Sequence, residues 1–204
     1  MKFKNKPLRI ACDGESASGK SFASKAIGSK YYLFVLNSGF AYRYASFLII
    51  KHKPKKIIPF LKKRYKNLNY KKITNLNLHS QKISDHVAIL AKQKKVREIM
   101  RIFQKKIIKK HQRICCEGRD QASTILRKNP KYDVAFYFKC NLNTASFRRW
   151  LDLKKKVPLK EVKKSLRTRT LLDIKRRHNT FKKMTDAVLI RTDILSKKAM
   201  VTKM

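Results

Sequence analysis

The sequence predicts an α/β fold, in which a parallel sheet of five strands is flanked by helices. Two observations lead to this prediction. Five short apolar runs alternate with stretches of helical spacing, which is the order that parallel strands joined by crossover helices require. A glycine-containing segment follows the first apolar run and opens the first helix, Gly14-Glu15-Ser16-Ala17-Ser18-Gly19-Lys20-Ser21.

This segment has the pattern G-x-x-x-x-G-K-S, and its spacing has a physical basis. Gly14 and Gly19 permit backbone angles and a close approach that a side chain would block. The intervening N–H groups can then surround an anion at the start of a helix. Lys20 would reach the β- and γ-phosphates of ATP, and the Ser21 hydroxyl would hold Mg²⁺. The predicted fold is therefore of the P-loop NTPase type, with residues 14–21 as the ATP-binding loop.

The five strands are expected to follow the apolar runs. The first covers residues 8–12, and a helix over 21–29, which Gly28 would end, leads to the second at 32–36. The remaining strands are a run that ends at Glu117, then residues 133–140 and residues 187–191.

Helices are predicted between these strands. Ser38 is expected to cap a helix over residues 44–50, and residues 51–80, rich in lysine, are interpreted as a small peripheral insert. Residues 83–110 have the spacing of a helix pair or one broken helix. Helices are also expected over 144–156 and 159–175, which Pro158 separates, and after Ser196.

Charged residues at the strand ends are the first candidates for a site. Glu117 ends an apolar run, where a carboxylate could support Mg²⁺ beside the phosphate loop, and Asp13 is its rival. Arg119 and Asp120 would point into the same crevice. Arg43 could bind a second phosphate, or it could simply be an exposed surface residue. On the helix over residues 83–110, Arg97 is the basic residue that we consider for a role beyond a solvated face.

Net charge is unusual. The chain of 204 residues has 53 Lys and Arg against 12 Asp and Glu, a net charge of +41. Nucleic-acid binding is one explanation, and a lysine-rich composition is another. The lysines are spread along the whole length, which favours composition. We expect nucleotides as partners, no specific nucleic acid and a monomer.

Cysteine usage and hydropathy predict the compartment. Cys12, Cys115, Cys116 and Cys140 form no C-x-x-C pair and lie in or beside apolar runs, which indicates buried, reduced thiols. The apolar runs are far shorter than the ~20 residues that span a bilayer, and the leading residues lack the apolar segment of a signal peptide. We expect the protein to be cytoplasmic and not to associate with a membrane.

Four segments together resemble the bacterial cytidylate (CMP) kinase family of nucleoside monophosphate kinases. DGESASGKS is similar to the family's D-G-x-x-x-x-G-K-[SGT], and LNSGFAYR to its L-D-[ST]-G-x-x-Y-R. EGRD resembles D-G-R-D. RTLLDIKR and TDAVLIRTDILS resemble R-D-x-x-D-x-x-R and D-A-x-x-[IL]-D-[ST]-[TS]-x-[LM]-[ST]. The segments lie in register over nearly the whole chain.

The resemblance implies transfer of the ATP γ-phosphate to CMP or dCMP, with Mg²⁺ as the metal ion. It implies one domain over residues 1–204: a core (1–43, 113–144, 181–204), an acceptor-binding insert (about 44–112) and a lid (about 145–180). The implied catalytic residues are Lys20, Arg119, Asp120, Arg148, Arg169 and Arg176. Those implied for the acceptor are Ser38, Arg43, Arg97, Arg119, Asp120, Arg169, Asp173 and Arg176, and those for the metal are Ser21 and Glu117.

Several positions depart from the family pattern. Glu117 and Asn37 each stand where an Asp is usual, and so does Arg191. Ala88 occupies the position that often supplies a serine to the cytosine, so the sequence does not predict discrimination between cytosine and uracil. Residues 121–124 also differ. These departures leave open a related small-molecule kinase with another acceptor. The net charge of +41 leaves open a basic, nucleotide-dependent RNA-binding protein.

Overall fold

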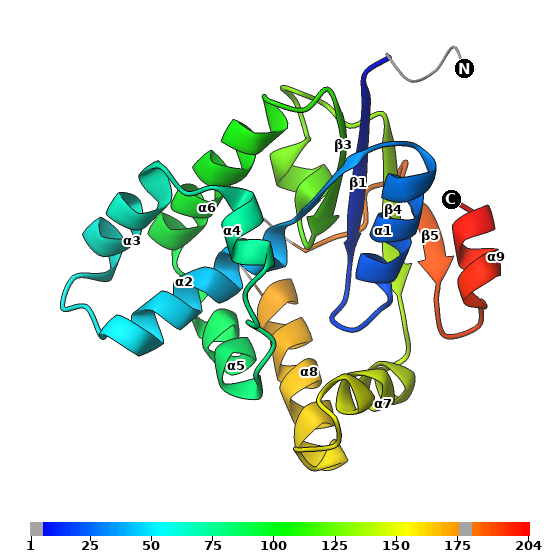
Figure 1. Ribbon diagram of the computed structural model, residues 1–204. Helices are drawn as coiled ribbons and strands as arrows, with labels where there is room; N and C mark the ends of the chain where they lie inside the picture. Colours follow the sequence, from blue (N-terminus) through cyan, green and yellow to red (C-terminus); the bar gives the residue numbers. More distant parts are fainter. Residues whose placement is uncertain (1–5, 176–180) are drawn as a thin grey trace. The chain divides into compact units, whose positions relative to one another are not determined.

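The structure is a computed structural model that describes residues 6–175 and 181–204 (Figure 1). The chain divides into two compact units. One comprises Met1–Asn37 and His111–Met204, and the other comprises Ser38–Lys110. No helix among the residues described is long and apolar enough to cross a membrane.

The first unit is built on a parallel sheet whose five strands have the order β2-β3-β1-β4-β5. This confirms the predicted fold class. The phosphate loop follows the central strand β1, so strands on both sides of it contribute residues near the loop. The strands are β1 (Leu8–Gly14), β2 (Phe34–Asn37), β3 (Arg113–Gly118), β4 (Val134–Lys139) and β5 (Val188–Arg191).

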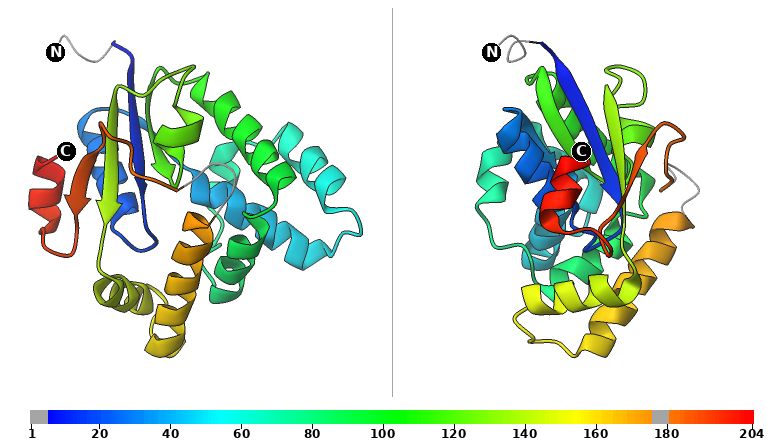
Figure 2. Two further views of the ribbon diagram at one scale, coloured as in Figure 1. Left: turned by 180° about the vertical axis from the view of Figure 1, so that it is seen from behind. Right: turned by 90° about the vertical axis from the view of Figure 1, so that its right-hand side faces the viewer.

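The core of this unit lies between the sheet and helices α1 (Lys20–Lys30) and α9 (Lys197–Thr202), which lie on the same face (Figure 2). Ile27 of α1 and Met200 of α9 share a buried cluster with Phe138 and Ile190 of the sheet. Cys12 and Cys115 belong to the same cluster, and all four cysteines are free and buried, as predicted. The helix predicted after Ser196 is α9, and Ser196 caps it by accepting from the Ala199 N–H.

The prediction that Gly28 ends α1 is wrong, because the helix continues to Lys30. The local signal misleads because this glycine has a tertiary role. A Cβ at position 28 would lie 2.4 Å from Cγ2 of Val35, so glycine lets α1 pack closely on β2.

Two helices, α7 (Leu142–Asp152) and α8 (Leu159–Ile174), lie beyond the carboxyl end of the sheet, the end that carries the phosphate loop (Figures 1 and 2). They pack on each other through a small apolar cluster that includes Ala145, Val162 and Leu166. A short π-helix, η1 (Gln121–Ile125), which the sequence did not suggest, follows β3.

The second unit is helical throughout its main elements. It contains α2 (Ser38–His52), α3 (Ile57–Lys66), α4 (Tyr70–Thr74), α5 (Gln81–Leu90) and α6 (Lys94–Ile108). The last two are the predicted helix pair. Residues 51–80, predicted to be a small peripheral insert, contain α3 and α4 and contribute to the packing of the second unit. Leu61, Tyr65 and Ile73 are buried, and the Tyr65 hydroxyl donates to the Ala41 carbonyl at 2.6 Å.

Candidate active site

The phosphate loop needs its two glycines. Gly14 has a φ of +148°, and a Cβ there would lie 2.2 Å from the carbonyl oxygen of Phe138 on β4. Gly19 has a φ of +77°, in the left-handed region, and directly precedes α1. Both conformations favour glycine, so the loop can approach β4 and turn into the helix with its N–H groups at the helix start.

Lys20 extends back over this loop. Its side chain is 7% exposed, and Nζ donates to the Glu15 carbonyl and to Ser18 Oγ, the latter at 3.2 Å. Burial lowers the pKa of Lys20 from 10.5 to about 7, and the positive charges of Arg119 and Arg169 contribute. The surroundings of Lys20 thus provide too little negative charge to stabilise its protonated form, and a bound phosphate would supply that charge.

Glu117 lies at the end of β3 and is 6% exposed. Ser21 Oγ donates to Oε1 at 2.6 Å, and Asn37 Nδ2 donates to Oε2 at 2.8 Å. Burial raises the pKa of Glu117, while the Lys20 charge and the Ser21 hydrogen bond oppose this effect. The hydroxyl and the carboxylate are oxygen donors of the kind Mg²⁺ prefers, so the pair fits that ion.

Asp13 has a different task. Its two carboxylate oxygens accept the backbone N–H groups of Gln121 and Ala122, each at 2.8 Å. Burial raises the pKa of Asp13 to about 7 despite these hydrogen bonds. The carboxylate therefore holds the segment that follows Asp120, and Glu117 is the better candidate for the metal.

Arg119 joins the loop to α8. Its guanidinium donates to the Gly14 carbonyl and to Ser16 Oγ, and its Nε lies 3.1 Å from Oδ2 of Asp173. The ring of Phe181 lies 5.5 Å from the guanidinium carbon. Burial lowers the pKa of Arg119 to about 10, which leaves it charged at neutral pH. Residues far apart in sequence thus converge here.

Two further predicted residues lie near this group. Asp120 is buried directly before η1, where its charge raises the pKa of Asp13. Arg169, four residues before Asp173 on α8, is close enough to lower the pKa of Lys20. The structure thus gathers Lys20, Arg119, Asp120, Arg169 and Asp173 at one end of the sheet.

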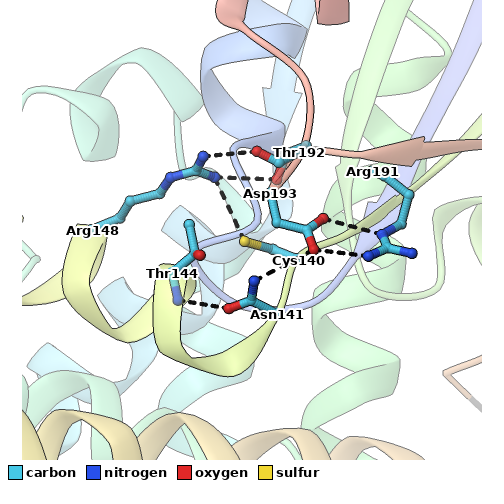
Figure 3. A network of polar contacts seen from close by, with 7 residues as sticks. All are labelled: Cys140, Asn141, Thr144, Arg148, Arg191, Thr192 and Asp193. Carbon is cyan, nitrogen blue, oxygen red and sulfur yellow. Dashed lines mark hydrogen bonds and ion pairs between the residues drawn. The ribbon is translucent and has the colours of Figure 1, made fainter.

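Among the residues that the structure describes, Arg148 is hydrogen-bonded not to the phosphate loop but to Thr192 and Cys140 (Figure 3). From α7 its guanidinium donates to the Thr192 carbonyl at 2.7 Å, to Thr192 Oγ1 at 3.2 Å and to Cys140 Sγ at 3.6 Å. Asp193, the next residue, accepts two hydrogen bonds from Arg191. In this structure Arg148 therefore ties α7 to the chain that follows β5.

The remaining predicted acceptor residues lie in the second unit. Arg43 donates to the Leu78 carbonyl and to Ser84 Oγ, both at 3.0 Å. Ser38, at the start of α2, and Arg97, on α6, are each 6% exposed. Arg176 lies outside the residues that the structure describes.

Comparison with known proteins shows the family of this chain. A family model for cytidylate kinase matches residues 10–204. The chain belongs to the cytidylate kinase family. A relative of that name from Mesomycoplasma hyopneumoniae (strain 7448) is 27% identical over 214 residues, which cover 97% of this chain and 92% of the relative. Another, from Clostridium botulinum (strain Hall), is 27% identical over 210 residues and covers 96% and 95%.

Solved structures share the fold of this cytidylate kinase family member. A putative kinase from Chloroflexus aurantiacus has a TM-score of 0.53 at 12% identity, covering 98% of this chain and 97% of its own. An uncharacterized protein from Eubacterium ventriosum has a TM-score of 0.54 at 13% identity, covering 97% and 96%.

Sequence reasoning missed three partners in the site of this family member. Asn37 was noted only as a departure from the family pattern, and neither Phe181 nor the hold of Asp13 on η1 was expected. For Asn37 a signal existed, because a parallel β2–β3 pair brings it opposite Glu117. For Phe181 no local pattern indicates the contact with Arg119.

Proposed function

We propose that this protein is a nucleoside monophosphate kinase that transfers the γ-phosphate of ATP to CMP or dCMP, giving CDP or dCDP and ADP. Membership of the cytidylate kinase family supports the reaction. The observation that carries the proposal is the group at the carboxyl end of β1 and β3, where the phosphate loop, the Ser21–Glu117 pair and Arg119 meet.

Each residue of this group has a task in the proposed reaction. An acceptor phosphate oxygen attacks the γ-phosphorus, the new P–O bond forms, and the bond to the bridging oxygen breaks as ADP leaves with the electron pair. Lys20 would bind the β- and γ-phosphates, and Arg119 and Arg169 would neutralise charge on the transferred group. Ser21 and Glu117 would hold Mg²⁺, which supplies charge neutralisation when bound. The acceptor phosphate is already a nucleophile, so no general base is needed.

Several residues predicted from the family resemblance are proposed to hold the acceptor. Asp120 and Asp173 are carboxylates suited to donor groups of the sugar or base, and Ser38, Arg43 and Arg97 complete the proposed acceptor site. Residues 44–112 would form the acceptor-binding insert and 145–180 the lid. Their closure would exclude water, which competes with the acceptor for the γ-phosphate. Arg176 belongs to the same proposed set, whereas Arg148 would first have to release Thr192.

The decisive experiment measures ADP formation from ATP and Mg²⁺ with CMP, dCMP, UMP and AMP as separate acceptors. We expect CMP and dCMP to be used in preference, and the Lys20→Ala variant to be inactive with each. Equal rates with UMP would refute cytosine selectivity. ADP formation that no acceptor stimulates would refute the kinase assignment.

One observation favours a second candidate, a related kinase with another acceptor. Ala88 on α5 has no hydrogen-bonding side chain at the position where relatives of this pattern often present a serine. A base held there would be selected by shape more than by a hydrogen bond, which gives weak discrimination. Comparable use of UMP, with Ala88→Ser restoring preference for CMP, would support this candidate.

A further inference from the structure

Two departures from the family pattern turn out to be partners. Glu117 and Asn37 are directly opposite each other in the parallel pairing of β3 with β2. The Asn37 amide donates to Oε2 of Glu117 at 2.8 Å. Glu117 replaces a shorter aspartate, and Asn37 replaces an acidic aspartate with a neutral amide. The two replacements lie at the two ends of one hydrogen bond.

With a glutamate at position 117, the geometry favours a hydrogen-bond donor at position 37. Ser21 already donates to Oε1 of Glu117 at 2.6 Å, so the second carboxylate oxygen needs a donor of its own. Glu117 is 6% exposed, and water therefore has little access to provide one. The amide of Asn37 is such a donor, whereas a carboxylate at this position would be a second acceptor facing the first.

We propose that Asn37 is a positioning residue that holds the Glu117 carboxylate in the orientation in which it supports the metal ion of ATP. This rests on the proposed function, because it assumes that Mg²⁺ accompanies ATP at Ser21 and Glu117. Partners that orient a metal-binding carboxylate act through that ligand and typically change metal affinity by about 10- to 100-fold when removed.

The charge balance supports the same conclusion. An aspartate at position 37 would add a negative charge directly opposite Glu117, and the two carboxylates would repel each other. The neutral amide avoids this repulsion and leaves a single negative charge whose orientation is defined by two hydrogen bonds.

The experiment compares ATP binding with and without Mg²⁺ by titration calorimetry, in the wild-type protein and in Asn37→Asp. We expect Asn37→Asp to lose at least about tenfold of the Mg²⁺-dependent gain in ATP affinity. Asn37→Ala adds no charge, and its affinity for ATP without Mg²⁺ should stay within about twofold of wild type, because the phosphate loop and Lys20 are unchanged. A residue with only a structural role would weaken binding equally in both conditions.

A double variant and a control sharpen the test. In Asn37→Asp with Glu117→Gln the glutamine amide can donate to Asp at position 37, so the melting temperature should return toward wild type. The Mg²⁺-dependent gain should not return, because the carboxylate is gone. Asn67→Asp, on an exposed asparagine, introduces the same charge and should change neither quantity.

Two outcomes would overturn the proposal. One is an Asn37→Asp variant with the full wild-type gain from Mg²⁺, and the other is an equal loss of affinity with and without the ion. If Asn37→Asp does not fold, Asn37→Ala removes the donor without adding charge and is judged by the same criteria. Absence of ATP binding by the wild-type protein is a different result, because it would refute the proposed function itself.

Discussion

The lowered pKa of Lys20 predicts that protons are taken up when ATP binds. Burial and neighbouring positive charge lower its pKa from 10.5 to about 7, so about nine-tenths of the side chains are neutral at pH 8 in protein without nucleotide. The phosphates of ATP would restore the charged form. Binding at pH 8 should therefore take up about 0.9 proton per ATP.

Calorimetry in two buffers of different ionisation enthalpy measures this uptake. Mg²⁺ is left out so that Glu117 does not contribute, and at pH 8 the Asp13 carboxyl, with a pKa of about 7, is already mostly ionised. Lys20→Arg is the matched control, because a guanidinium stays protonated throughout and should bind without uptake. Identical binding enthalpies of the wild-type protein in both buffers at pH 8 would refute the reasoning.

The same shift affects stability. In the unfolded chain Lys20 titrates near 10.5, so between pH 7 and 10.5 the unfolded state binds more protons than the folded state. The contribution of Lys20 to the free energy of unfolding should therefore rise with pH across this window and be lost as the pH falls to about 7. Lys20→Met should remove that part of the pH dependence in denaturation experiments.

Three further predictions concern structure around the site. Gly14→Ala should lower the free energy of unfolding by about 3 kcal/mol in urea denaturation, because its Cβ would overlap the Phe138 carbonyl; an unchanged midpoint would contradict this. Asp173→Ala should cost about 3 kcal/mol by leaving Arg119 without its buried partner, and adding Arg119→Ala should cost less than the sum of the two; strict additivity would exclude coupling. Arg148→Met should cost about 2 kcal/mol and leave kcat within a few fold, with exposed Lys154→Met as control; a 100-fold loss of kcat at unchanged stability would instead make Arg148 catalytic.

The sheet and the phosphate loop were predictable because their signals are local. Buried parallel strands appear as short apolar runs, and the loop motif is contiguous, so neither depends on distant residues. The second unit was harder. The helical spacing of α3 and α4 is hard to recognise in the sequence, because buried apolar residues such as Leu61 and Ile73 are few and lie among exposed lysines. The apolar part of a lysine side chain can cover hydrophobic surface in place of an apolar residue.

The hydrogen-bonding roles in the site depend on register and packing. Asn37 and Glu117 are 80 residues apart, and only the β2–β3 pairing makes them neighbours. Arg148 illustrates the same limit: the resemblance suggests a role in transfer, while its hydrogen bonds to Thr192 depend on where the chain leaves β5. Sequence patterns indicate which residues are polar and near a strand end, and tertiary structure decides which partner each one takes.

The phosphate loop is already hydrogen-bonded to two cationic side chains of the site. Two of its own oxygens, the carbonyls of Glu15 and Gly14, already accept hydrogen bonds from Lys20 and Arg119. A nucleotide therefore enters by competition, since each cation must exchange a backbone carbonyl for a phosphate oxygen. A carbonyl is a weak rival to a multiply charged triphosphate but a fair rival to a single phosphate or a sugar hydroxyl. We therefore expect a triphosphate to displace the two carbonyls, and a ligand of lower charge to leave Lys20 and Arg119 hydrogen-bonded to them.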